Sequence, residues 1–143
     1  MALVYFDASA FVKLVVEEDG SELAADLWNG CDAALSSRLT YPEVSAALAA
    51  AARDRRITGP AFDEAQAAWD ELWATTRPVE LTAAVEQAAG GLARTHALGG
   101  ADAVHLASAL AVGSAHLVLA VWDHRLHAGA AAAGLAVAPA TVV

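Results

Sequence analysis

Short apolar runs alternate with longer helix-like segments along the whole chain of 143 residues. The runs are rich in strand-forming residues, and most of the segments between them begin with a capping residue or repeat apolar positions at helical spacing. The predicted strands are 3–6, 33–36, 78–81, 117–121 and 135–137; the predicted helices are 8–16, 19–30, 40–56, a segment from 58 onward, 82–97, 101–112 and 125–133. Strands that alternate with helices favour a parallel sheet covered on both faces. The sequence therefore predicts one α/β domain, residues 1–143, built as a three-layer sandwich with a central parallel sheet flanked by helices.

The composition excludes several classes of protein. Hydrophobic residues make up 57% of the chain and charged residues 17%, which excludes a disordered chain. The single cysteine, Cys31, excludes a disulfide scaffold within one chain and a cysteine-based zinc finger, and it fits a reducing cytoplasm. The net charge of −9 excludes nucleic-acid binding by overall positive charge. It does not exclude a nuclease, because a bound metal can reverse the local sign of a site.

One stretch raises the question of a membrane helix. Residues 103–122 carry no formal charge over twenty positions. However, Asp102 and Asp123 flank the stretch, and the pair 113–114 (Gly-Ser) interrupts it. A buried helix, a turn and a buried strand explain it better, so no membrane segment is expected. The N-terminus lacks the basic region of a targeting peptide.

The carboxylates are unevenly placed, and four of them stand alone in their segments. Residues 87–143 contain only two, Asp102 and Asp123, and each interrupts apolar sequence. Asp7 is the only acid among the first sixteen residues, and Glu43 is similarly isolated in a long Ala-rich helix. This isolation distinguishes the four residues from an ordinary solvated run of charges.

The predicted topology brings most of these carboxylates together. Ligands of open parallel sheets bind outside the carboxyl ends of the strands. Asp7 and Asp123 each follow a predicted strand, and Glu43 lies in the first turn of a helix that leaves another strand. We therefore expect these three at one edge of the sheet. Asp102 begins a helix, and only its apolar setting singles it out.

A cluster of carboxylates predicts a metal site. Carboxylates within a few ångströms repel one another, and some must protonate unless a cation joins them. Oxygen ligands suit Mg²⁺ or Mn²⁺, which can activate a water, hold a phosphate and stabilise a leaving oxygen. Ser9, two residues after Asp7, could orient that carboxylate, bind a phosphate or cap the first helix.

Each candidate also has a structural interpretation. Glu43 could complete a capping box that begins three residues earlier, Asp102 could complement a helix N-terminus, and Asp123 could cap the next helix. Asp7 is the hardest to explain in this way, because a charge at the end of a buried strand is costly without a partner. His105, three residues after Asp102, is expected to be a packed or hydrogen-bonded core histidine.

The basic and aromatic residues favour structure or assembly over RNA binding. Arg53, Arg55 and Arg56 end a helix, where cations favour the helix dipole. Trp69 and Trp73 have helical spacing, which indicates core or interface more than stacked bases. The apolar surface of so small a chain favours a homodimer or a bound partner.

Four segments together resemble the PIN-domain ribonucleases. Residues 3–14 (LVYFDASAFVKL) resemble the opening of that family, and residues 39–44 (LTYPEV) look like its second motif. Residues 102–109 (DAVHLASA) are similar to the third motif, and residues 121–126 (VWDHRL) match the fourth more weakly. Their order and separations fit over essentially the whole chain. The likeness is greatest to the VapC-type toxins of bacterial toxin–antitoxin pairs.

This resemblance implies a parallel-sheet sandwich that cuts RNA with Mg²⁺, or with Mn²⁺ in its place. It implies that Asp7, Glu43, Asp102 and Asp123 form an acidic cluster with Ser9 beside it. Asp7 and Asp102 are then the expected metal ligands, with a direct or water-mediated contact from Asp123, and Glu43 positions or deprotonates the attacking water. Members of the family usually dimerise and are inhibited by an antitoxin whose tail enters the active-site groove.

The leading hypothesis is thus a Mg²⁺-dependent endoribonuclease toxin, cytoplasmic and homodimeric, that cleaves tRNA or rRNA and binds a cognate antitoxin. A metal-dependent phosphohydrolase of small phosphate esters is the first alternative, because an acidic chain with few cations suits a small substrate. The second is a catalytically degenerate, partner-binding domain. Its support is Val121, which stands two residues before the fourth acid where Ser or Thr is common in the family.

Overall fold

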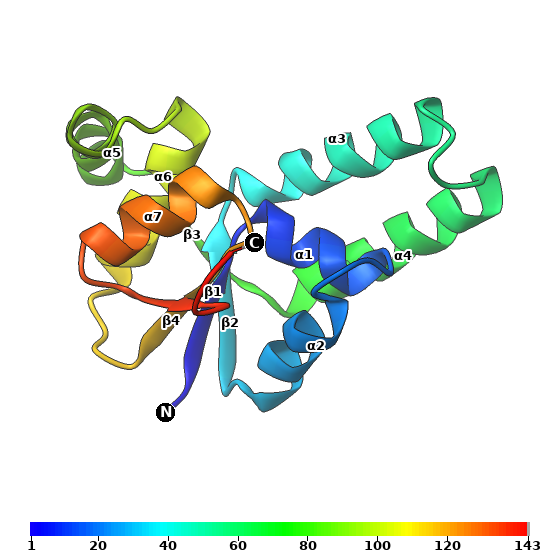
Figure 1. Cartoon of the computed structure of the whole chain (residues 1–143), viewed down its shortest axis with the longest axis horizontal. Coiled ribbons are helices and arrows are strands. Elements are labelled where there is room, and N and C mark those ends of the chain that lie inside the picture. Colours follow the sequence, from blue (N-terminus) through cyan, green and yellow to red (C-terminus); the bar gives the residue numbers. More distant parts are fainter. Residues whose placement is uncertain (143) are drawn as a thin grey trace.

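The computed structural model describes residues 1–142, and within them every predicted strand and helix is present (Figure 1). The strands are β1 (Leu3–Phe6), β2 (Ala33–Ser37), β3 (Arg77–Val79), β4 (Leu117–Ala120) and β5 (Ala136–Ala138). The helices are α1 (Ala8–Val15), α2 (Ser21–Gly30), α3 (Thr40–Arg53), α4 (Gly59–Thr75), α5 (Ala83–His96), α6 (Gly100–Val112) and α7 (His124–Ala132). The bounds differ from the predicted ones by a few residues; β3, for example, begins one residue earlier than predicted.

The five strands form one parallel sheet in the order β3-β2-β1-β4-β5. The strand β1 is central, and its Leu3 aligns with Ala33 of β2 on one side and with Leu117 of β4 on the other. Because all strands are parallel, their carboxyl ends lie at one edge, which is the upper edge in Figure 1. The α/β fold with a central parallel sheet flanked by helices, predicted from the sequence, is confirmed.

Alternate residues of β1 face two separate hydrophobic clusters, which accounts for the three layers. Leu3 and Tyr5 pack with side chains of α5, α6 and α7 on one face of the sheet. Val4 and Phe6 pack with side chains of α1, α3 and α4 on the other face. A strand covered on both faces needs apolar residues at every position, and the continuous run in β1 meets that requirement.

Aromatic side chains fill the cluster on the α1–α4 face. Trp69 is fully buried, with its ring centroid 4.7 Å from that of Phe11 and 5.6 Å from that of Tyr41, against which it stacks. Its indole N–H donates to the Tyr41 carbonyl over 3.2 Å. Trp73 packs beside it at 5.6 Å. The prediction that Trp69 and Trp73 are packing residues is confirmed.

The uncharged stretch 103–122 divides between a helix and a strand. The helix α6 ends at Val112, Gly113 adopts a φ of +67° in the turn, and β4 follows at Leu117. Within the described part of the chain, none of the helices combines the length and hydropathy needed to cross a membrane.

Two glycines with positive φ offer a matched test of the packing. Gly20 has a φ of +93°, and a Cβ there would lie 2.7 Å from Nε1 of Trp122. Gly134 has a φ of +89°, and a Cβ there would meet no atom within 4 Å. We expect Gly134→Ala to lower the free energy of unfolding by about 1 kcal/mol, the cost of left-handed backbone for alanine. Gly20→Ala should cost at least about 1 kcal/mol more in urea denaturation, because Trp122 must also move. Equal losses would contradict this packing.

Candidate active site

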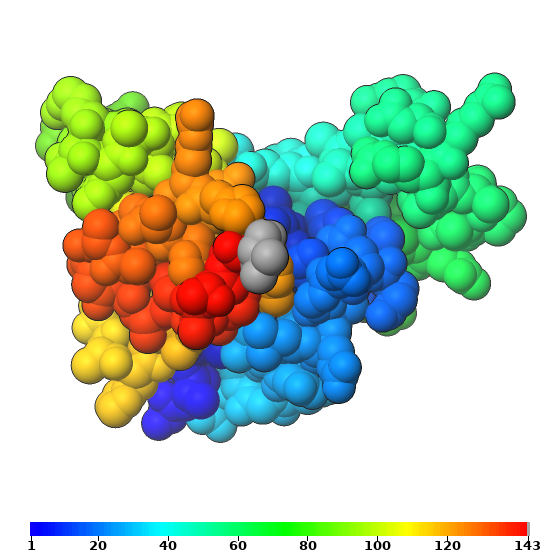
Figure 2. All heavy atoms as spheres, viewed as in Figure 1, coloured from blue at the N-terminus to red at the C-terminus, as the bar shows by residue number. Residues whose placement is uncertain are grey.

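The candidate site lies at the carboxyl edge of the sheet. Asp7 follows β1, Asp123 lies three residues after β4, and Glu43 lies in the first turn of α3, which follows β2. Asp102 lies in the first turn of α6. In Figure 2, the end of α5 and the α3–α4 hairpin rise on either side of a hollow, and Figure 1 shows the carboxyl ends of β1 and β2 running toward it.

Asp7 is a buried carboxylate that is only partly satisfied by hydrogen bonds. It caps α1, and its Oδ1 accepts from the Ala10 backbone N–H over 3.0 Å and from the Ser9 hydroxyl over 2.6 Å. Within residues 1–142 its Oδ2 accepts no hydrogen bond, and this oxygen is not among the polar atoms sealed in the interior. Burial raises the pKa of Asp7 to about 6, although the charge of the nearby His105 acts to lower it. One oxygen of Asp7 is therefore available to a cation.

Ser9 joins the ends of the two central strands. Its hydroxyl donates to Asp7 and accepts from the backbone N–H of Trp122, just after β4, over 3.0 Å. The N–H of Asp7 in turn donates to the carbonyl of Ala120 over 3.3 Å. Of the roles considered for Ser9, these two bonds fit the orientation of the Asp7 carboxylate, so Ser9 can influence a substrate through the position of Asp7.

Glu43 does not cap its helix. The helix α3 begins at Thr40, whose hydroxyl lies 2.6 Å from that of Ser36, and no side chain caps the first turn. The capping-box interpretation of Glu43 is therefore wrong, because the hydroxyl that it requires is turned into the core. Instead, Oε1 of Glu43 lies 2.6 Å from Nε2 of His105 on α6.

His105 links Glu43 to the centre of the sheet. Its Nδ1 lies 2.9 Å from the Tyr5 hydroxyl, which also accepts the backbone N–H of Ser37 over 3.0 Å. Burial alone would favour the neutral imidazole, but the hydrogen bond to Glu43 and the charge of Asp7 outweigh it and raise the pKa of His105. The protonated ring donates from both nitrogens, which fits both contacts. The expectation of a hydrogen-bonded core histidine is confirmed, and the carboxylates around it favour its protonated form.

Asp102 completes the cluster from α6. Burial and the charge of Asp123 raise its pKa, whereas His105 and Arg125 oppose that rise. Asp123 also caps α7, since its Oδ1 accepts from the N–H of Leu126 over 2.9 Å, so the capping interpretation of Asp123 is confirmed. Because Asp123 and Glu43 act on Asp102 and Asp102 acts on Asp7, carboxylates from four distant segments lie in one electrostatic neighbourhood.

The donor set fits Mg²⁺ or Mn²⁺ better than zinc. Within residues 1–142, no three side chains of His, Cys, Asp or Glu converge to hold a metal by themselves. Structural zinc sites need four such ligands, whereas Mg²⁺ uses one or two carboxylates and retains several waters. The unpartnered oxygen of Asp7, with Asp102 close enough to raise its pKa, meets that smaller requirement.

Two features of the site had no local signal in the sequence. Glu43 and His105 are 62 residues apart, and only the packing of α6 against the end of β2 brings them together. Arg125 lies on the exposed side of α7, and its effect on Asp102 depends on how α6 and α7 pack. The sequence indicated only that His105, three residues after Asp102, lies on the same side of that helix as Asp102.

A family model for the PIN domain matches residues 4–130. The chain belongs to the PIN domain family. Two curated relatives from two strains of Mycobacterium tuberculosis, named Ribonuclease VapC45 and Ribonuclease VapC49, are each 70% identical over 140 residues. Each alignment covers 98% of this chain and 97% of the relative, so this PIN domain is of the VapC type.

Solved PIN-type structures share this arrangement of strands and helices. VapC20 of Mycobacterium tuberculosis, described as a sarcin-ricin loop cleaving toxin, superposes with a TM-score of 0.67 at 21% identity over 92% of this chain and 95% of that one. FitAcB of Neisseria gonorrhoeae superposes with a TM-score of 0.70 at 17% identity, covering 94% and 95%. At such identities the likeness establishes the fold alone.

The buried charge of Asp7 predicts that a site mutation stabilises the PIN domain. The pKa of Asp7 is about 6 in the folded protein, against 3.8 for an ordinary aspartate, so the folded protein binds more protons and loses stability as the pH rises between these values. Asp7→Asn keeps an acceptor oxygen for Ser9 and removes the charge. In metal-free buffer at pH 8 we expect this variant to be more stable by up to about 3 kcal/mol, and near pH 4 to match the wild type, in urea denaturation. If Asp7→Asn were less stable than the wild type at pH 8, the buried charge of Asp7 would not be destabilising, and the raised pKa would be wrong.

The imidazolium of His105 predicts a coupled titration. Its charge is the largest of the effects that lower the pKa of Asp7. His105→Gln should therefore raise the pKa of Asp7 above about 6, as followed by the chemical shift of its carboxyl carbon in NMR. The control His116→Gln removes an exposed imidazole outside the cluster and should leave this titration unchanged. An unchanged pKa in His105→Gln would show that His105 is neutral.

Proposed function

We propose that this protein is an endoribonuclease, the toxin of a toxin–antitoxin pair, that hydrolyses RNA with Mg²⁺ or Mn²⁺. One observation carries the proposal: the buried Asp7 has an oxygen without a hydrogen bond within residues 1–142 and lies near Asp102, which in turn is affected by the charges of Asp123 and Glu43. The names of the relatives that are 70% identical, which describe ribonucleases, support RNA as the substrate class.

Asp7 and Asp102 are the residues that would hold the metal, and Asp123 would contact it directly or through water. When bound, the cation supplies positive charge that lowers the pKa of a water and stabilises the leaving oxygen. Asp102 raises the pKa of Asp7, and Asp123 and Glu43 raise the pKa of Asp102, so divalent positive charge would relieve this repulsion.

Glu43 would accept the proton of the attacking water. Its Oε1 is held by His105, whereas its Oε2 makes no hydrogen bond within residues 1–142 and can accept a proton. The water oxygen forms a bond to phosphorus in line with the P–O3′ bond, which breaks. The 3′ oxygen takes a proton from solvent, and the products carry a 5′-phosphate and a 3′-hydroxyl.

The proposal includes protein partners. Structural neighbours such as the toxin–antitoxin complex from Klebsiella pneumoniae, with a TM-score of 0.68, support a cognate antitoxin for this chain. The net charge of −9 suits a basic inhibitor, because complementary charge accelerates association. We expect the protein to act in the cytoplasm as a homodimer.

Cleavage of tRNA and rRNA tests the proposed activity. We expect the wild type to cleave with Mg²⁺ and to lose activity in excess chelator. Asp7→Asn should reduce the rate at least about 100-fold while the protein stays folded, because a metal-ligand oxygen is lost. Product ends should carry 5′-phosphates, as determined by ligation with an RNA ligase.

Matched controls separate this activity from the alternatives. Asp26→Asn removes an exposed carboxylate of α2 outside the cluster and should leave the rate unchanged. Metal-dependent hydrolysis of simple phosphate esters without RNA cleavage would favour the small-ester phosphohydrolase. Full RNA cleavage by Asp7→Asn would refute the mechanism.

A further inference from the structure

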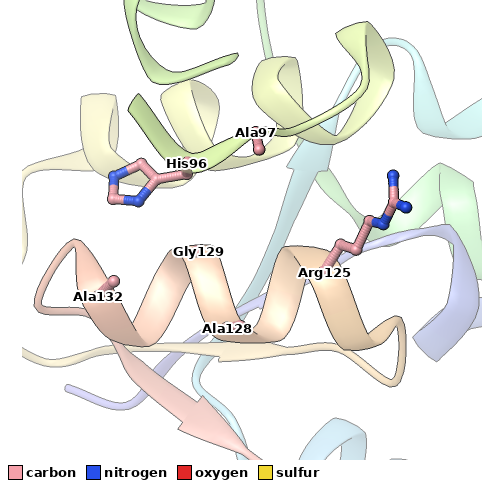
Figure 3. Close-up of a pocket in the computed structure, with 6 residues that line it drawn as sticks. All are labelled: His96, Ala97, Arg125, Ala128, Gly129 and Ala132. Carbon is pink, nitrogen blue, oxygen red and sulfur yellow. The ribbon is translucent and has the colours of Figure 1, made fainter. Parts of the chain in front are cut away.

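A groove between the end of α5 and the outer side of α7 has no role in the chemistry described so far. It has a volume of about 510 Å³ (Figure 3). The residues that line it are His96, Ala97, Arg125, Ala128, Gly129 and Ala132. Its lining contains no carboxylate.

Small residues keep the middle of the groove open, and side chains with N–H donors lie at its two ends. Figure 3 shows Arg125 at one end of α7 and His96 near Ala132 at the other. These ends lie about 10 Å apart along the helix, at 1.5 Å per residue. A Cβ on Gly129 would lie 3.3 Å from the methyl groups of Leu98, so glycine lets the turn after α5 seat closely on α7.

The groove begins at the candidate active site. Asp123 caps α7, and Arg125 lies in the first turn of the same helix, two residues later, so this end of the groove adjoins the carboxylate cluster. A ligand that has one phosphate at the cluster can therefore extend past Arg125 into the groove. A small phosphate ester would not reach it.

The distribution of charge favours this path for a polyanion. Residues 1–86 hold fifteen of the seventeen carboxylates and six of the eight lysines and arginines, and so carry the whole net charge of −9. Residues 87–143, which include the groove, are formally neutral and contain all five histidines. A phosphate backbone is repelled least on this half of the molecule.

We propose that the groove between α5 and α7 binds the ribose-phosphate backbone of single-stranded RNA beside the cleaved bond. Arg125 contacts the phosphate nearest the cluster, and His96 contacts one further along. The small residues between them leave room for the sugar and phosphate. This inference rests on the proposed ribonuclease function and names where its substrate lies.

Binding to a fluorescein-labelled RNA of twelve nucleotides tests the groove without cleavage. All variants are made in an Asp7→Asn background with Mg²⁺ present, and affinity is measured by fluorescence anisotropy. Ala132 is exposed and lines the groove, whereas Ala67 is an exposed alanine on α4, outside it. Ala132→Glu should weaken binding about fivefold and Ala132→Lys should strengthen it about threefold, because each changes the charge beside a phosphate. Ala67→Glu and Ala67→Lys should change the affinity less than twofold.

The salt dependence gives a second readout. Each phosphate contact of a single strand contributes about 0.7 to the slope of log affinity against log salt. Arg125→Ala should reduce that slope by about 0.7, whereas Arg53→Ala at the far end of α3 should leave it unchanged. The proposal would be overturned if the substitutions at Ala132 and Ala67 changed the RNA affinity equally, or if both Ala132 variants bound RNA more weakly. It would also be overturned if the protein did not bind the RNA. These experiments measure RNA binding and not cleavage, so they test the groove independently of whether the wild type cleaves RNA.

Discussion

The charge of Asp7 at the end of the central strand is the constraint on which the rest of the site depends. A buried carboxylate must be hydrogen-bonded, paired or protonated. This chain satisfies one oxygen with the start of α1 and with Ser9, and places His105 nearby. The other oxygen accepts no hydrogen bond within residues 1–142, and burial keeps the pKa of Asp7 raised. Such unrelieved charge favours the binding of a cation.

The parallel sheet and its helices form this cluster from residues that are far apart in the chain. The strands end at one edge, and α1, α3 and α7 begin there, so their first turns face the same volume with the positive ends of their dipoles. The arrangement lowers the cost of assembling negative charge and suits an anionic substrate. The neutral C-terminal part of the chain then offers a polyanion the least repulsive approach.

The predictions from sequence succeeded where local pattern decides structure. The apolar run in β1 and the isolated Asp7 after it depend on neighbouring residues alone, and both lie where they were expected. The alternative interpretation of Glu43 as part of a capping box was wrong, because its spacing from Thr40 only imitates that motif. The hydroxyl of Thr40 instead turns toward Ser36 in the core, and a competing tertiary contact of this kind leaves no trace in local sequence.

The sequence by itself determined the order of strands and helices, the α/β class and the isolation of four carboxylates, because hydrophobic periodicity and residue spacing are local properties. Only the tertiary structure decided that His105 lies between Glu43 and Tyr5 and that Arg125 lies near Asp102. Such contacts depend on the angles and separations at which helices pack on the sheet. Many side chains share in setting those quantities, so no short stretch of sequence encodes them.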